Sequence, residues 1–178
     1  MYTGLDLSLT GTGLANISSR GQVVYELFGT KKQDYKHAWD RIESIVNNVN
    51  DFLSKTNTKY VLIEDYVISP RNSKTTIQLV ELGAAVRYAL YKDGIAFITV
   101  TPPVLKKYAT GSGNAKKNIV IKELYKNHKI DVDDDNVADA IYLAMLCKQL
   151  KLKKQPKQKY IKDLLAKIDK EREKVNWK

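Results

Sequence analysis

The order of strand-like and helix-like segments is the feature that most restricts the possible folds of this chain. Three short strand-like segments come first, and helical patterns with apolar residues three and four positions apart then alternate with two further strands. The expected strands are residues 2–8, 13–18, 22–28, 60–66 and 95–100, and the expected helices are residues 36–54, 73–91, 115–127 and 136–150. A helix between two parallel strands crosses one face of their sheet, so this order predicts an α/β protein: a five-stranded mixed sheet with helices on both faces. The stretch between the last strand and the 115–127 helix is expected to be partly loop.

Positive charge is concentrated at the C-terminal end of the chain. The formal net charge is +10, and residues 148–178 hold 12 Lys and Arg against 4 Asp and Glu. We expect one domain in residues 1–150, followed by a basic C-terminal tail in residues 151–178. This charge favours a polyanionic partner, nucleic acid or an anionic membrane surface, over a solvated tail that only aids solubility.

The tail is expected to be partly helical. An apolar stripe at helical spacing follows the break near Pro156 and consists of Ile161, Leu164, Leu165 and Ile168. Two interpretations stay open, and both can hold. The helix packs on its own domain or on a dimer partner, or the tail lies on DNA as a basic arm.

Several classes of protein are excluded by what the sequence lacks. No apolar run of 18 residues is present, so no membrane span is expected. The N-terminus does not have the pattern of a secretory signal. Cys147 is the single cysteine, which excludes a disulfide framework and fits a reducing compartment such as the cytoplasm.

Acidic residues occur at positions where a carboxylate is unusual. Asp6 lies in the middle of the first expected strand, Glu64 at the end of the fourth, and Asp139 inside the last helix, with Asp135 and Asn136 one turn before it on the same face. Carboxylates that converge raise one another's pKa unless a cation binds between them. Hard oxygen ligands suit Mg²⁺ or Mn²⁺, and pairs of such ions support phosphodiester chemistry. The sequence therefore predicts a metal site at these five residues.

Four motifs in order resemble the RuvC family of Holliday junction resolvases, which have an RNase H-like fold. GLDLSLTGTGLA, with Asp6, is similar to the first-strand motif of the family, and VLIEDY, with Glu64, to the second. VLKKYATGSGNAKK resembles the family's basic loop, and VADAIYLA, with Asp139, its last catalytic helix. The resemblance covers about residues 1–148. It is strong because the four short motifs have the right order and spacing.

The resemblance implies a structure-selective endonuclease that cuts Holliday junctions and related branched DNA. It implies a Mg²⁺ cofactor, which Mn²⁺ can replace, metal-assisted phosphodiester hydrolysis that leaves 5′-phosphate ends, and a homodimer. RNSKTTIQLVELGAAV is similar to the helix that builds the family's dimer interface, so residues 73–91 are the expected interface. The small, divergent chain looks like a phage-type member, which would act in the cytoplasm of a bacterial host.

The same resemblance assigns roles to basic and aromatic residues. The catalytic residues would be Asp6, Glu64 and Asp139, with Lys117 and then Lys106 stabilising the charge that develops on the phosphate. The expected DNA-binding residues are Tyr66, Arg71, Lys74, Lys106, Lys107, Lys116 and Lys117.

The chain departs from the family pattern at Asn136, where the family usually has an acid or a histidine. Asp135 would then supply the missing carboxylate, or the Asn136 amide oxygen would coordinate the ion without charge. Three alternatives stay open. They are a general debranching nuclease that acts on flaps and forks, a catalytically silent module that binds branched DNA, and an actin-like ATP-binding protein. The last is suggested by GLDLSLTGTG, but no second glycine-rich phosphate loop is seen.

Overall fold

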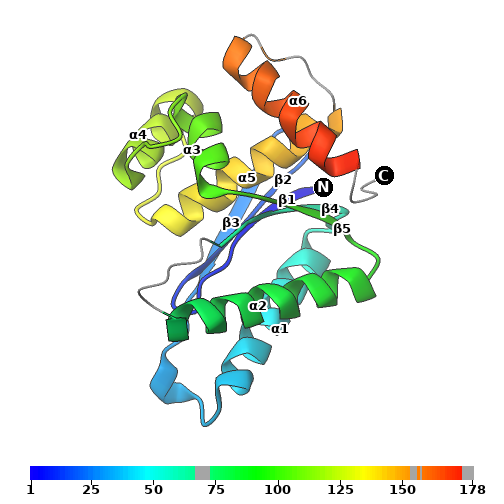
Figure 1. Cartoon of the computed structure of the whole chain (residues 1–178), viewed down its shortest axis with the longest axis vertical. Helices are drawn as coiled ribbons and strands as arrows, with labels where there is room; N and C mark the ends of the chain where they lie inside the picture. Colours follow the sequence, from blue (N-terminus) through cyan, green and yellow to red (C-terminus); the bar gives the residue numbers. More distant parts are fainter. Residues whose placement is uncertain (67–72, 153–155, 157, 174–178) are drawn as a thin grey trace.

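A five-stranded mixed sheet forms the centre of the molecule (Figure 1). The structure is a computed structural model that describes residues 1–66, 73–152, 156 and 158–173. The strands are β1 (Tyr2–Asp6), β2 (Thr12–Ile17), β3 (Val23–Phe28), β4 (Tyr60–Glu64) and β5 (Ala96–Val100). Their order in the sheet is β3-β2-β1-β4-β5, with β1 antiparallel to β2 and parallel to β4. The predicted mixed sheet is confirmed.

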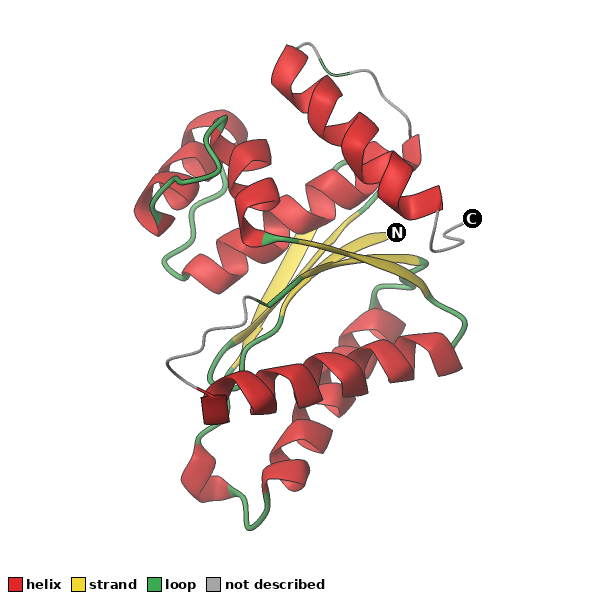
Figure 2. Ribbon diagram, in the orientation of Figure 1, coloured by secondary structure: helices red, strands yellow, loops and turns green. Residues whose placement is uncertain are grey.

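Helices cover both faces of this sheet (Figure 2). One face carries α1 (Ala38–Lys55) and α2 (Ser73–Lys92). The other carries α3 (Pro102–Thr110), α4 (Lys117–His128), α5 (Asp135–Leu152) and α6 (Lys159–Glu173). A short 3₁₀ helix, η1 (Lys32–Asp34), precedes α1.

One expectation about local structure is confirmed and another was wrong in detail. The segment expected to be partly loop is helix α3 in its first part, because Pro102 and Pro103 occupy the first helical positions, where proline favours a helix start, and it is a loop between α3 and α4. Strand β1 ends at Asp6 and does not continue to residue 8, since the Thr12 hydroxyl donates a 2.7 Å hydrogen bond to the Ser8 carbonyl and closes a turn. Asp6 therefore lies at the end of its strand, like Glu64, and not in the middle.

Helix α5 lies directly on the backbone of β1 and β2. A Cβ atom at Gly4 would stand 2.0 Å from the Ala140 carbonyl oxygen, and one at Gly13 would stand 2.1 Å from the Asn136 carbonyl oxygen. Only glycine fits at these two positions, because backbone atoms occupy the space of any side chain. The glycines of the first-strand motif thus set the depth of α5 on the sheet.

The opposite face is packed through larger side chains. Leu5, Ile45, Val61, Leu82 and Val86 are all buried in one cluster between the sheet, α1 and α2. Here the distance between helix and sheet is that of interlocked aliphatic side chains and not of backbone contact.

The C-terminal helix α6 packs on the domain of its own chain. Leu164 and Ile168 are 7% and 4% exposed and belong to the same core cluster as α5. This agrees with the first interpretation of the tail and leaves the basic arm on DNA as a prediction. None of the helices in the described residues is both long and apolar enough to cross a membrane.

Candidate active site

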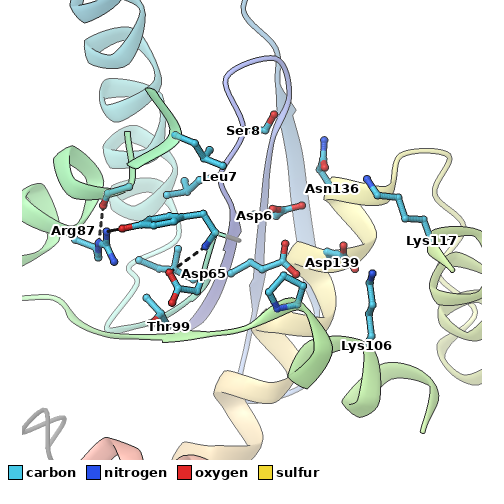
Figure 3. A pocket seen from close by; sticks show the side chains of 16 residues that line it. Asp6, Leu7, Ser8, Asp65, Arg87, Thr99, Lys106, Lys117, Asn136 and Asp139 are labelled. Carbon is cyan, nitrogen blue, oxygen red and sulfur yellow. Dashed lines mark hydrogen bonds between the residues drawn. The ribbon is translucent and has the colours of Figure 1, made fainter. Parts of the chain in front are cut away.

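Three carboxylates meet at the ends of neighbouring elements (Figure 3). Asp6 ends β1, Glu64 ends the parallel strand β4, and Asp139 lies in the second turn of α5. Each offers one oxygen that lies within 4.8 Å of the oxygens of the other two. Asp6 and Asp139 are 8% and 7% exposed. The sequence prediction that these three residues converge is met by the geometry.

The position of Asp139 depends on where α5 begins. The Asp134 carboxylate accepts hydrogen bonds from the backbone N–H groups of Asn136 at 2.8 Å and Val137 at 3.2 Å. This is the pattern of an N-cap residue, so Asp134 fixes the first turn of α5. The close contact of α5 with Gly4 and Gly13 then brings Asp139 down to the strand ends.

Burial and nearby negative charges raise the pKa of all three carboxyl groups. Burial is the largest cause for Asp6, whose pKa lies well above its usual range, followed by the charges of Glu64 and Asp139. Burial and the charge of Asp139 raise the pKa of Glu64 to about 7. Burial and the charge of Asp135 raise the pKa of Asp139 to about 6.

This donor set fits a divalent cation. Asp6 and Asp139 are buried, Glu64 is half-buried, and all three have raised pKa values, so a cation between them would offset the repulsion among their negative charges. The donors are all hard oxygens, which suit Mg²⁺ or Mn²⁺ and not a soft metal. Asp6, Glu64 and Asp139 are therefore the residues that could hold such an ion.

Lysines border the carboxylates on one side. Lys106 on α3 and Lys117 at the start of α4 line the same pocket of about 300 Å³, together with Asn136. Their positive charge lowers the pKa of Glu64 and Asp139 and so opposes part of the effect of burial. Lys117 also donates a hydrogen bond to Asp135, and this contact is the largest cause of its raised pKa.

The two candidates for a fourth ligand occupy different places. Asn136 lines the pocket, and its side-chain amide donates a 2.8 Å hydrogen bond to the Gly11 carbonyl oxygen. Asp135 is paired with Lys117 and is not one of the three residues whose carboxylates converge. Asn136 therefore lines the same pocket as the three carboxylates, and a ligand role for either residue stays a prediction.

The predicted DNA-binding residues are only partly brought together. Tyr66 lines the pocket with Lys106 and Lys117. Three of the predicted residues, Lys74, Lys107 and Lys116, are exposed and do not line it. Arg71 lies outside the described residues.

Comparison with known proteins places this geometry in a family. The family model described as crossover junction endodeoxyribonuclease RuvC matches residues 2–148. The chain belongs to the RuvC family. RuvC of Brachyspira hyodysenteriae is 25% identical over 148 residues, which cover 80% of this chain and 89% of that protein.

Solved RuvC structures have the same fold. Thermus thermophilus RuvC has a TM-score of 0.67 at 20% identity and covers 85% of this chain and 95% of its own. A second structure of T. thermophilus RuvC, in complex with a Holliday junction substrate, has a TM-score of 0.68 at 21% identity, over 80% of this chain and 89% of its own. The predicted RuvC membership and RNase H-like fold are confirmed, and the phage-type origin stays a prediction.

A basic residue at the pocket of this RuvC member is not among the site residues predicted from the sequence. Arg87 on α2 lines the pocket, and helix α2 was considered only as a dimer interface. A signal was present, because Arg87 is the one charged residue in the otherwise uncharged run from Leu82 to Tyr91.

Proposed function

We propose that this RuvC family member is a Holliday junction resolvase, a homodimeric endonuclease that cuts two strands of a four-way DNA junction by metal-assisted hydrolysis. The observation that supports this most directly is the meeting of Asp6, Glu64 and Asp139 at one point in a chain of this family. Membership in the family also favours a nuclease over the ATP-binding alternative.

The three carboxylates would hold divalent ions, with Mg²⁺ as the proposed cofactor and Mn²⁺ as a substitute. Such ions supply Lewis-acid stabilisation of the phosphate and lower the pKa of a water molecule. The chain itself contributes fixed carboxylate oxygens on three rigid elements, so little movement is needed when the ion binds.

Lys106 and Lys117 would bind and orient the phosphate that is cut. Both line the pocket that contains the carboxylates, and an ammonium group there stabilises negative charge that develops on phosphate oxygens. Asp135 would keep Lys117 in position through their hydrogen bond until the phosphate arrives. The exposed Lys74, Lys107 and Lys116 would contact more distant phosphates of the junction arms.

The homodimer would form through the outer face of α2. Ile77, Tyr88 and Tyr91 are 57%, 64% and 73% exposed, and with exposed Ala84 they follow one stripe along the helix. A two-fold dimer would present two active sites to the two equivalent strands of a junction.

A cleavage assay with matched variants tests the proposal. Purified protein is incubated with labelled four-way junctions, three-way junctions, flaps and linear duplexes, in Mg²⁺, in Mn²⁺ and in EDTA. We expect symmetric nicks in four-way junctions with either metal and none in EDTA. Asp6→Asn and Asp139→Asn should each lower the rate by on the order of a thousandfold, equal to about 4 kcal/mol of transition-state stabilisation. The exposed Asp131→Asn is the matched control and should cut normally.

The outcomes separate the alternatives. Equal cutting of flaps and four-way junctions would indicate a general debranching nuclease. Junction binding without cutting in either metal would indicate a silent binding module. Cutting in EDTA would contradict the metal site.

A further inference from the structure

Helix α2 has a third face, between the residues buried in the core and the proposed dimer interface, that borders the active-site pocket. Leu82, Val86 and Leu90 are buried toward the sheet, and the exposed stripe defined above points outward. Leu79, Gly83 and Arg87 are spaced four residues apart on a third face, and all three line the active-site pocket. Arg87 therefore brings a positive charge to this pocket from the dimer helix.

The side chain of Arg87 is held in place by two contacts. Its Nε donates a 2.9 Å hydrogen bond to the Gly83 carbonyl oxygen, and its Nη2 donates a 3.0 Å hydrogen bond to the Tyr66 hydroxyl. The Tyr66 ring lies against Gly83, where a Cβ atom would stand 3.2 Å from the ring. Tyr66, Gly83 and Arg87 thus form one packed unit at the wall of the pocket.

The charge of Arg87 is not neutralised by a carboxylate. Within the part of the chain that the structure describes, no acidic group lies within ion-pair distance of its guanidinium. An arginine has five N–H donors, and the two contacts above use only two of them. A half-buried guanidinium with donors to spare, in a pocket, favours an anionic ligand.

The position of Arg87 shows which anion it can take. Arg87 lies on one side of Asp6 and Asp139, and Lys106 and Lys117 lie on the other (Figure 3). A DNA strand whose scissile phosphate sits at the carboxylates carries its next phosphate one nucleotide away. The pocket of about 300 Å³ is lined by both the carboxylates and Arg87, so one occupant can contact both.

We propose that Arg87, positioned by Tyr66 and the Gly83 carbonyl, binds the backbone phosphate next to the one that is cut. This inference rests on the proposed function, because it takes a DNA strand as the occupant of the pocket. Arg87 would bind the strand equally before and during the reaction, so it would contribute to affinity and register more than to the chemical step.

Binding and cleavage by five forms of the full chain test the proposal: wild type, Arg87→Met, Arg87→Lys, Tyr66→Phe and Lys92→Gln. Lys92→Gln is the matched control, since it removes a positive charge from an exposed position at the end of the same helix, outside the pocket. Four-way junction affinity is measured over a series of salt concentrations in an Asp6→Asn background, which keeps the junction intact. Cleavage kinetics are measured in the active background. Melting temperature and oligomeric state are recorded for each form.

Arg87→Met should weaken binding about tenfold and make the plot of log K against log salt shallower by about 0.7 to 0.9, the value for one lost phosphate contact. It should raise KM by a similar factor and change kcat less than threefold. Arg87→Lys should keep the salt slope and bind several-fold more weakly, and Tyr66→Phe should have a smaller effect than Arg87→Met. The control should match the wild type.

Two results would overturn the proposal. One is an unchanged salt slope in Arg87→Met, whether or not the melting temperature falls, which would make Arg87 a structural residue. The other is an affinity loss that coincides with loss of the dimer, which would assign Arg87 to the interface. A wild type that neither binds nor cuts branched DNA would overturn the proposed function itself. A wild type that cuts, together with an unchanged salt slope in Arg87→Met, would overturn only the role proposed for Arg87.

Discussion

The two faces of the sheet are packed in different ways. One face positions the carboxylates of the candidate site, and the other presents the proposed dimer surface. On the α5 face, Gly4 and Gly13 let helix backbone touch strand backbone. On the α1 and α2 face, aliphatic side chains such as Leu5, Ile45 and Val86 fill the space. On the α5 face no side chains lie between helix and strand at these two glycines, so the distance is fixed by backbone contact. On the other face the side chains can adjust by rotamer changes.

This difference matters because the candidate active site is built on the α5 face. Asp139 is carried by α5, while Asp6 and Glu64 are carried by the strands beneath it. Small errors in the distance between α5 and the sheet would separate the carboxylates, and misplacement of about 1 Å can cost on the order of 100-fold in rate. The other face tolerates more variation and presents the outer surface of α2.

Adding one methyl group to the α5 face should have the largest effect. In Gly4→Ala the new Cβ would stand 2.0 Å from the Ala140 carbonyl oxygen, and backbone cannot move aside as a side chain can. We expect a loss of about 3 kcal/mol or more in the free energy of unfolding, at or beyond the upper end for overpacking. Urea denaturation measures it.

Two controls sharpen this test. Gly11→Ala places a Cβ 3.4 Å from its nearest neighbours and should change stability by less than about 1 kcal/mol. Ile45→Val removes one methyl group from the opposite face and should cost about 0.5 to 1.5 kcal/mol. Gly4→Ala with wild-type stability would show that α5 does not rest on β1.

A charge on the outer stripe of α2 should break assembly and spare the fold. Tyr88→Glu places a carboxylate on the exposed face, 64% exposed in the single chain, where a dimer partner would bury it. We expect a monomer by sedimentation, with a melting temperature close to that of the wild type at low protein concentration. Two coordinated nicks per junction should become single nicks.

Tyr25→Glu is the matched control for this prediction. Tyr25 is 48% exposed on the edge strand β3, away from the α2 stripe. If Tyr88→Glu and Tyr25→Glu have the same oligomeric state, α2 is not the interface.

The sequence predicted the fold and the meeting of three carboxylates, but not how closely α5 packs against the sheet. Asp6, Glu64 and Asp139 could be found because a carboxylate at the end or in the interior of an apolar element needs a reason. Helix α3 was partly missed because two prolines indicate a loop as readily as a helix start. Arg87 was missed because its role depends on which face of α2 meets the pocket, and helical periodicity fixes that face only when the position of the sheet is known.

Removing one carboxylate from the site should stabilise the metal-free protein at neutral pH. The pKa of Glu64 is raised from 4.5 to about 7, so the folded state holds its proton after the unfolded chain has lost it. Stability that is present below about pH 4.5 is therefore lost as the pH rises toward 7. Glu64→Gln abolishes this loss, and its melting temperature in EDTA should exceed that of the wild type by a few degrees at pH 8 and by little at pH 4.5.

Calorimetry at several pH values checks this prediction, with Glu43→Gln as the control because Glu43 is exposed on α1. With added Mn²⁺ at pH 8, the wild type should melt at a higher temperature than Glu64→Gln, since the ion stabilises the wild type and not a form that lacks a ligand. A Glu64→Gln protein that melts lower than the wild type in EDTA at pH 8 would show that the three carboxylates do not repel one another.

The smallest expected effects concern the fourth metal ligand. They test whether the α5 face accepts a carboxylate at position 136, where this chain has an asparagine. The Asn136 amide donates to the Gly11 carbonyl oxygen at 2.8 Å. Asn136→Asp replaces that donor with a charged acceptor beside a carbonyl oxygen, so in EDTA the variant should melt lower, by about 1 kcal/mol of lost stability. When a divalent ion is present, the added carboxylate should attract and bind it. The Mn²⁺ concentration for half-maximal stabilisation of the variant should therefore be several-fold lower than for the wild type.

Asp135→Asn separates the two roles open to Asp135, which are positioning of Lys117 and ligation of the metal ion. In the structure Asp135 pairs with Lys117, and Asp134 already caps the helix, so a loss of the carboxylate should release Lys117 and leave α5 intact. If Asp135 only positions Lys117, the variant should cut more slowly with an unchanged requirement for Mg²⁺. If Asp135 is the fourth ligand, the Mg²⁺ concentration needed for half-maximal cutting should rise several-fold. A titration of cutting rate against Mg²⁺ for both variants distinguishes these results, because a ligand shifts the midpoint of the curve and a positioning residue shifts its plateau.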